Sequence, residues 1–154
     1  MESPASPPVD ANGTVRFSVP ATLPEVARAV ERLQHQLPRR LDEHQQHQVA
    51  IALAEVLTNI VEHGYENRGG PAIDVTMNTT DRWLAVEVRD AGLPIPMDKL
   101  EQAGPETSFG FDPTDLAALP EGGMGLGIIK TAFEYVDYRS QGGTNRLRLG
   151  KRLR

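Results

Sequence analysis

The spacing of apolar residues changes several times along the chain, and each change marks an expected element. Strict alternation of apolar and polar side chains is typical of a half-buried β-strand, with one face in the core and one in water. Five such runs predict strands at 14–19, 73–77, 84–88, 136–140 and 145–150. A turn at 79–82 joins the second run to the third.

Apolar residues spaced by three and four predict helices between these strands. The first helix begins at a capping-box sequence, Thr22-Leu-Pro-Glu25, and Pro38 ends it. The second runs from about 42 to 63 and the third from about 123 to 135. The order favours an α/β two-layer sandwich, in which a mixed, mostly antiparallel sheet packs on three helices.

Residues 91–123 consist mainly of Gly, Pro, Asp and Glu, with short helical stretches expected only near 97–102 and 114–119. A segment of this length with little regular structure is often a lid over a functional site. Residues 1–12 are rich in Pro, Ser and Ala, have little to bury, and predict a disordered tail. Residues 13–154 are expected to form one domain.

The composition narrows the function classes. The 154 residues include no cysteine, which excludes a disulfide framework, a thiolate metal site and a cysteine nucleophile. A net charge of −5 argues against a general nucleic-acid binder. No apolar run approaches the roughly 20 residues that span a bilayer, and the first residues lack a signal-peptide pattern. A soluble cytoplasmic protein that binds neither nucleic acid nor membrane is expected.

Three polar residues, Glu55, Asn59 and His63, recur every four positions in the second helix and therefore share one face. An asparagine oxygen suits Mg²⁺, which combines few protein ligands with phosphates and water. A glutamate one turn away can accept the proton of an attacking hydroxyl or water. A solvated polar stripe explains the same spacing. A zinc triad is a weaker alternative, because asparagine is a poor zinc ligand.

Asp90-Ala91-Gly92 directly follows the strand pattern, where a carboxylate can accept the exocyclic amine of adenine. The same residues also fit an ordinary turn that closes a strand. Together with the helical residues before it and a glycine run after it, however, this piece indicates a nucleotide site.

The glycine run is Gly122-Gly123-Met124-Gly125-Leu126-Gly127, and it precedes an apolar helix. The free N–H groups at a helix N-terminus attract phosphates. The run lacks the preceding strand of a Rossmann fingerprint and the lysine of a Walker A motif. A flexible loop at a helix start is the plainer interpretation of this run alone.

The remaining charged residues are interpreted as surface residues. Solvated positions are expected for His35, His44 and His47. A basic outer face on an end strand is expected from Arg146, Arg148, Lys151, Arg152 and Arg154. Such a face more often discourages edge pairing than it binds a partner. Trp83 begins a strand and is expected in the core or at its rim.

These motifs resemble the three boxes of the GHKL ATPase and kinase superfamily. Glu55-x-x-x-Asn59 is similar to the N box, Asp90-x-Gly92 to the first glycine box, and Gly123-x-Gly125-x-Gly127 to the second. Segment 54–67 resembles, more narrowly, the N box of the RsbW-like anti-sigma-factor serine kinases, and the ending 143–153 is also similar to theirs. The resemblance covers about residues 14–153.

The resemblance implies a Bergerat-type fold that binds Mg-ATP beneath a long ATP lid at about 91–123. Asn59 would hold Mg²⁺, Asp90 would read adenine, and Glu55 would be the base for a serine or threonine of an antagonist protein. The nucleotide site would be completed by His63, Gly92, Gly123, Met124, Gly125, Leu126, Gly127 and Thr144. Arg28 would face the antagonist's phosphorylation site.

The implied function is that of a protein-serine/threonine kinase and anti-sigma factor. Such a protein would phosphorylate a STAS-type anti-anti-sigma antagonist, sequester a sigma factor, and form a homodimer. The alternative is a nucleotide-binding regulatory module that binds partners without phosphoryl transfer. One departure from the family pattern is Pro94, which stiffens the start of the lid where the first glycine box often has a second glycine. A sensor-histidine-kinase fragment is disfavoured, because no dimerising helical pair precedes the N box.

Overall fold

A computed structural model of the protein describes residues 13–95 and 126–153, with side chains in the second range from Gly127 onward. The strands are β1 (Thr14–Val19), β2 (Ile73–Thr79), β3 (Trp83–Asp90), β4 (Tyr135–Gln141) and β5 (Thr144–Arg152). The helices are α1 (Leu23–His35), α2 (Glu43–Asn59), the π-helical turn η1 (Ile60–Gly64) and α4 (Leu126–Ala132). The expected tail and most of the expected lid, residues 1–12 and 96–125, lie outside the described ranges.

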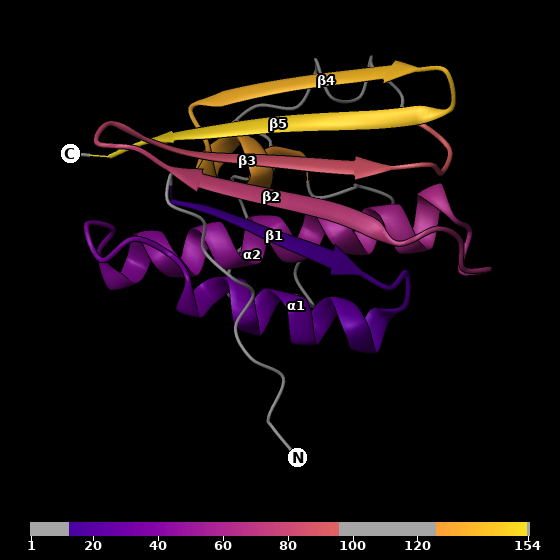
Figure 1. Cartoon of the computed structure of the whole chain (residues 1–154), viewed down its shortest axis with the longest axis horizontal. Helices are drawn as coiled ribbons and strands as arrows, with labels where there is room; N and C mark the ends of the chain where they lie inside the picture. The colour runs from indigo at the N-terminus through magenta and orange to yellow at the C-terminus, as the bar shows by residue number, and fades with distance from the viewer. Residues whose placement is uncertain (1–12, 96–125, 154) are drawn as a thin grey trace.

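The strands form one sheet in the order β1-β2-β3-β5-β4, and every pairing is antiparallel. Figure 1 shows the sheet as one layer and the helices as the other. The predicted two-layer α/β sandwich is therefore confirmed. The expectation that 145–150 is an end strand is wrong, because β5 lies between β3 and β4, and the two edge strands are β1 and β4.

The two layers meet through alternating strand residues. Leu84, Val86 and Val88 of β3 are buried against the helices, while the intervening side chains point to the opposite face. The helices contribute the other half of one continuous core. Its helical members include Val26, Ala29, Leu33, Val49, Leu53, Val56, Leu57, Ile129 and Ala132.

The helix starts differ in part from the sequence-based expectation. Thr22 is the N-cap of α1, but its side chain makes no capping hydrogen bond, so the expected capping box is wrong. A capping box forms instead at α2. There, Asp42 Oδ1 accepts from the Gln45 N–H at 2.7 Å, and Gln45 Oε1 accepts from the Asp42 N–H at 3.0 Å. This reciprocal pair fixes where the site-bearing helix begins.

The C-terminal end of that helix is also unusual. The single helix expected over 42–63 divides into α2 and the wider π-helical turn η1. The Tyr65 N–H donates to the Ile60 carbonyl at 2.7 Å, and the Asn67 N–H donates to Val61 at 2.9 Å. π-helical turns are rare and occur frequently at functional sites. None of the described helices is long and apolar enough to span a bilayer.

Candidate nucleotide-binding site

Glu55 and Asn59 lie one turn apart at the C-terminal end of α2. Asn59 is buried, with 6% of its surface exposed, and Glu55 is half-buried. His63, one turn further in η1, is exposed. The solvated-stripe interpretation therefore fits His63 but is wrong for Asn59. Because burying a carboxamide costs free energy unless its polar atoms are engaged, this position favours a specific role.

The carboxyl group of Glu55 has a pKa above its ordinary value. Burial disfavours the charged form, and the nearby charge of Glu62 raises the pKa further. A carboxylate with a raised pKa is a stronger proton acceptor, which is the property that a general base needs. Glu55 thus combines a position beside Asn59 with suitable acid–base chemistry.

Asp90 ends β3 and is held by the next strand in the sheet. Its Oδ1 accepts from Asn145 Nδ2 at 2.9 Å and from the Gly92 N–H at 2.8 Å. Asn145 is opposite Asp90 in the β3–β5 register and has 1% of its surface exposed. The hydrogen bonds found among the described residues engage only Oδ1 of Asp90. Its second oxygen accepts no hydrogen bond within those residues.

Both polar atoms of the Asn145 side chain are hydrogen-bonded. Its Nδ2 also donates to the Gly92 carbonyl at 2.8 Å, and its Oδ1 accepts from Ser140 Oγ at 2.7 Å. One buried carboxamide therefore connects β4, β5, the end of β3 and the residues that follow β3. Such a fully satisfied buried network fixes a unique geometry.

The residues after Asp90 are attached to the end of the site-bearing helix. The Leu93 N–H donates to the Gly64 carbonyl at 2.9 Å, and the Ala91 N–H donates to the Tyr65 hydroxyl at 3.0 Å. A Cβ at Gly92 would lie 2.7 Å from the carbonyl carbon of Gly64. Glycine at 92 is therefore required by this contact between the two motifs, whether or not a ligand approaches it.

The glycine run falls largely outside the described residues. Gly123, Met124 and Gly125 are not described, while Leu126 and Gly127 form the start of α4. That helix packs against α2. The start of α4 and the end of α2 therefore belong to the same layer. Phosphate binding by the glycine run stays a prediction.

Two further predicted residues lie away from the Asp90 network. Thr144 is exposed at the start of β5 and pairs with Gln141, while its neighbour Asn145 makes the contact to Asp90. Arg28 is exposed on α1, where its Nη1 lies 3.1 Å from Glu25.

The sequence analysis missed Asn145, although its position offered a signal. It occupies the same strand phase as Leu147 and Leu149, which point into the core. An asparagine in an otherwise apolar phase indicates a buried polar contact. Tyr65 was also missed, because its role depends on a loop contact 26 positions away.

The described residues contain no group of three or more His, Cys, Asp or Glu side chains that could hold a metal. Magnesium has different requirements, since it takes one or two protein oxygens together with phosphates and water. The buried carboxamide of Asn59 fits that donor set.

Comparison with known proteins agrees with this arrangement. A family model described as the histidine kinase-like ATPase domain matches residues 18–151. The anti-sigma F factor of Clostridium acetobutylicum is 31% identical over 97 residues, covering 62% of this chain and 61% of that protein. The serine-protein kinase RsbW of Halalkalibacterium halodurans is 31% identical over 96 residues, covering 62% and 56%. The chain thus spans about three-fifths of the length of these relatives.

A crystal structure gives the same fold. It contains the RsbU and RsbW domains of a Mycobacterium tuberculosis protein and superposes with a TM-score of 0.61 at 18% identity. The match covers 91% of this chain and 32% of that one. The resemblance to the GHKL superfamily and to its anti-sigma-factor kinases is confirmed.

Proposed function

Because the chain belongs to the family of histidine kinase-like ATPase domains, we propose that it is an ATP-dependent protein-serine/threonine kinase and anti-sigma factor. The observation that carries the proposal is the junction of two motifs. The end of the helix that bears Glu55 and Asn59 is bonded directly to the Asp90–Gly92 turn. The relatives named anti-sigma F factor and serine-protein kinase RsbW support the same activity.

Asp90 reads the base. Its Oδ1 is held by Asn145 and Gly92, so the carboxylate cannot rotate freely. The second oxygen accepts a hydrogen bond from the exocyclic amine of adenine. Guanine presents an acceptor oxygen at that position, and an acceptor facing a carboxylate would leave both groups unpaired. This chemistry selects ATP over GTP.

Asn59 holds Mg²⁺, and His63 extends the same helical edge toward the phosphates. Backbone N–H groups of segment 123–127, including those of Met124 and Leu126, donate to the phosphate oxygens. When bound, Mg²⁺ neutralises charge on the phosphates. Thr144 supports the rim of the adenine pocket, and its exposure at the start of β5 leaves it accessible to a ligand.

Glu55 acts as the general base. It accepts the proton of a serine or threonine hydroxyl while that oxygen forms its bond to the γ-phosphorus and ADP departs. Phosphoryl transfer depends on positioning and charge stabilisation, with little covalent work for the protein. A carboxylate with a raised pKa, held by a regular helix, supplies the proton acceptor in a fixed place.

The phosphoryl acceptor is a STAS-type anti-anti-sigma protein, and the sequestered partner is a sigma factor in the cytoplasm. Arg28, which is exposed on α1, is the residue that contacts the antagonist in this proposal. Competition between the partners then switches the system, since phosphorylation releases the antagonist and frees the kinase for sigma. The protein acts as a homodimer. A nucleotide-binding module without transfer remains the second candidate function, because the described geometry serves nucleotide binding as well as catalysis.

Transfer is tested with γ-labelled ATP and Mg²⁺ in lysate of the source cell, with purified wild-type protein or a Glu55→Gln variant. The proposal predicts a small labelled protein that appears only with wild type. Asn59→Asp serves as a second variant, since it changes the charge at the metal position but leaves Glu55 intact. If no labelled protein depends on Glu55 while ATP binding is preserved, the proposed kinase activity is wrong. The nucleotide-binding module without phosphoryl transfer then stands.

A further inference from the structure

Two buried tyrosine hydroxyls, one from each layer of the sandwich, bind the backbone that follows β3. We call residues 91–95 the box segment. The Ala91 N–H donates to the hydroxyl of Tyr65, which directly follows η1, at 3.0 Å. The Ile95 N–H donates to the hydroxyl of Tyr138 on β4 at 2.8 Å. The box segment is therefore held from the helical layer at one end and from the sheet at the other.

The other backbone donors of the box segment are also engaged. The Gly92 N–H donates to Asp90 Oδ1 at 2.8 Å. The Leu93 N–H donates to the Gly64 carbonyl at 2.9 Å. Pro94 has no N–H, and its ring fixes its own φ angle. Because all of these bonds are made within the protein, the box segment needs no ligand to hold its conformation.

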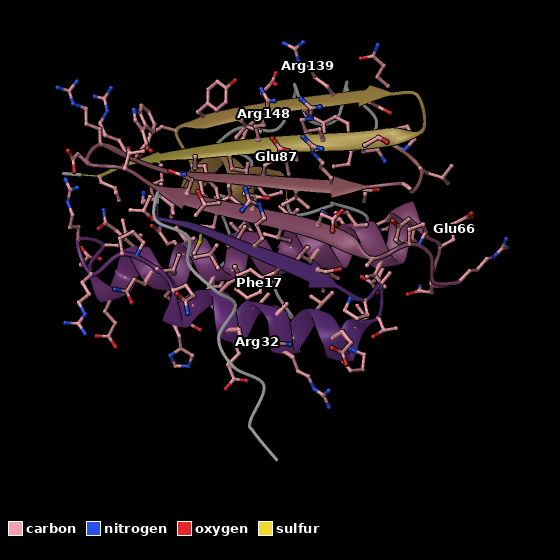
Figure 2. All side chains as sticks on the ribbon, viewed as in Figure 1. Phe17, Arg32, Glu66, Glu87, Arg139 and Arg148 are labelled. Atoms are coloured by element: carbon pink, nitrogen blue, oxygen red, sulfur yellow. The ribbon has the colours of Figure 1, made fainter. Side chains whose placement is uncertain are left out.

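The ring of Tyr65 is fixed by close packing on both sides. A Cβ at Gly92 would lie 2.7 Å from a ring carbon, and a Cβ at Gly70 would lie 3.2 Å from the same ring. The chain then turns through Glu66 and Asn67, whose φ angles of 54° and 58° are uncommon for residues with a Cβ. Figure 2 shows Glu66 at the end of the molecule where β3 ends and β5 begins. This tightly packed turn fixes Tyr65 against the box segment.

The edge strand β4 reaches the site at two positions. Tyr138 is buried on the helical side of the sheet, in the same strand phase as Ser140. Ser140 Oγ donates to Asn145, which in turn donates to Asp90. Tyr138 makes the second connection, to Ile95. One strand therefore supports both the carboxylate and the end of the box segment.

Both hydroxyls lie near the charge of Asp90. Burial raises the pKa of Tyr65 and of Tyr138 above the ordinary value, and the hydrogen bonds from the backbone oppose this shift. The carboxylate of Asp90 raises both pKa values further. Each phenol therefore stays neutral near pH 7, where it accepts its N–H without adding negative charge beside Asp90.

Core packing alone does not account for the two hydroxyls. Tyr65 and Tyr138 each have 7% of their surface exposed and belong to the continuous apolar core. Phenylalanine would fill the same space, and burying a hydroxyl costs free energy unless it is hydrogen-bonded. Within the described chain, the hydrogen bond of each hydroxyl goes to the box segment. The two hydroxyls therefore serve that segment.

We propose that Tyr65 and Tyr138 are positioning residues that hold the adenine side of the site in its binding conformation before the nucleotide binds. Their role rests on the proposed function, in which Asp90 reads adenine. An ordered box segment keeps Gly92 beside Asp90 Oδ1, so nucleotide binding does not have to order it. Without a hydroxyl, the segment occupies this conformation for a smaller fraction of the time. The apparent affinity for ATP falls by that fraction.

The test uses the full chain and the variants Tyr65→Phe and Tyr138→Phe, singly and combined. Each substitution keeps the ring and removes the acceptor. Isothermal titration of ATP with Mg²⁺ should show about three- to tenfold weaker binding for each single variant, and weaker binding still for the combination. Tyr135→Phe is the matched control, since it removes a hydroxyl from an exposed position on the opposite face of β4. It should leave ATP affinity unchanged.

Amide hydrogen exchange distinguishes positioning from a general loss of stability. Without nucleotide, Tyr138→Phe should accelerate exchange of the Ile95 N–H at least about fivefold more than that of core amides such as Val86. Tyr65→Phe should do the same at Ala91. Saturating ATP should restore slow exchange at both positions, because binding then selects the ordered segment.

The outcomes separate this role from the proposed function. If wild type binds ATP and the combined variant binds it equally well, the positioning role is wrong and the proposed function stands. Equal acceleration of all slowly exchanging amides would also overturn the positioning role, because it would show a general loss of stability. A wild-type protein that binds no ATP would overturn the proposed function, and the positioning role with it.

Discussion

Asn145 Nδ2 donates to Oδ1 of Asp90 at 2.9 Å and thereby ties the start of β5 to the end of β3. The two residues are 55 positions apart. Their contact fixes the carboxylate of the strand-terminal Asp90, and none of the hydrogen bonds among the described residues engages its second oxygen. The account of nucleotide selection depends on this pair.

Replacing Asn145 by alanine should weaken ATP binding about tenfold and destabilise the fold by about 1–3 kcal/mol, because buried partners lose their hydrogen bonds. Ser140→Ala, which removes one of those bonds, should show a smaller effect in the same direction. Isothermal titration and thermal unfolding measure both quantities. Unchanged ATP affinity in a folded Asn145→Ala protein would show that Asp90 needs no such support.

Gly92→Ala should destabilise the protein by about 1–3 kcal/mol, because the added Cβ has no room beside Gly64 and Tyr65. Gly64→Ala provides the matched control on the other side of the same contact. Its Cβ would lie 3.6 Å from the Leu93 carbonyl oxygen, an ordinary distance. Chemical denaturation distinguishes the two variants, and equal stabilities would contradict the packing argument.

Glu55→Gln should raise the Tm near neutral pH. The folded-state pKa of Glu55 lies above its ordinary value, so the folded protein holds this proton more tightly than the unfolded chain. The associated stability is complete below the unfolded pKa of about 4.3 and is lost as pH rises through the folded pKa. The neutral glutamine avoids this loss.

The difference in Tm between Glu55→Gln and wild type should therefore shrink toward acid pH. A pH series of thermal melts checks this, with Glu31→Gln, at an exposed position of α1, as the control. A variant that is equally or less stable than wild type at neutral pH would show that burial of Glu55 imposes no such cost.

The sequence predicted the strands and helices because each depends on the spacing of apolar residues within its own segment. The strand at Thr14–Val19 has the predicted bounds, and the strands at β3, β4 and β5 extend the predicted runs by one or two residues at their ends. The turn η1 was missed, since a π-helical turn keeps nearly the same apolar spacing as an α-helix over five residues. The capping box at Asp42 was missed because Gln45 lies in a run of polar residues, where no apolar residue indicates the start of the helix.

The nonlocal features could not be predicted in the same way. Placement of β5 between β3 and β4 depends on pairing between segments that are more than 50 positions apart. That one error changed the interpretation of the arginines on β5, which were assigned to an edge. Of the site, the sequence identified Glu55, Asn59 and Asp90, while Asn145 and Tyr65 became visible only through their contacts.

The most direct test of the central claim is isothermal titration of ATP and GTP, each with Mg²⁺, into wild type and Asp90→Asn. The account predicts that wild type binds ATP and strongly disfavours GTP. Asp90→Asn, which replaces an acceptor oxygen with a donor, should lose at least about tenfold in ATP affinity. Equal affinity of wild type and Asp90→Asn for ATP would contradict the assignment of Asp90 as the residue that reads adenine.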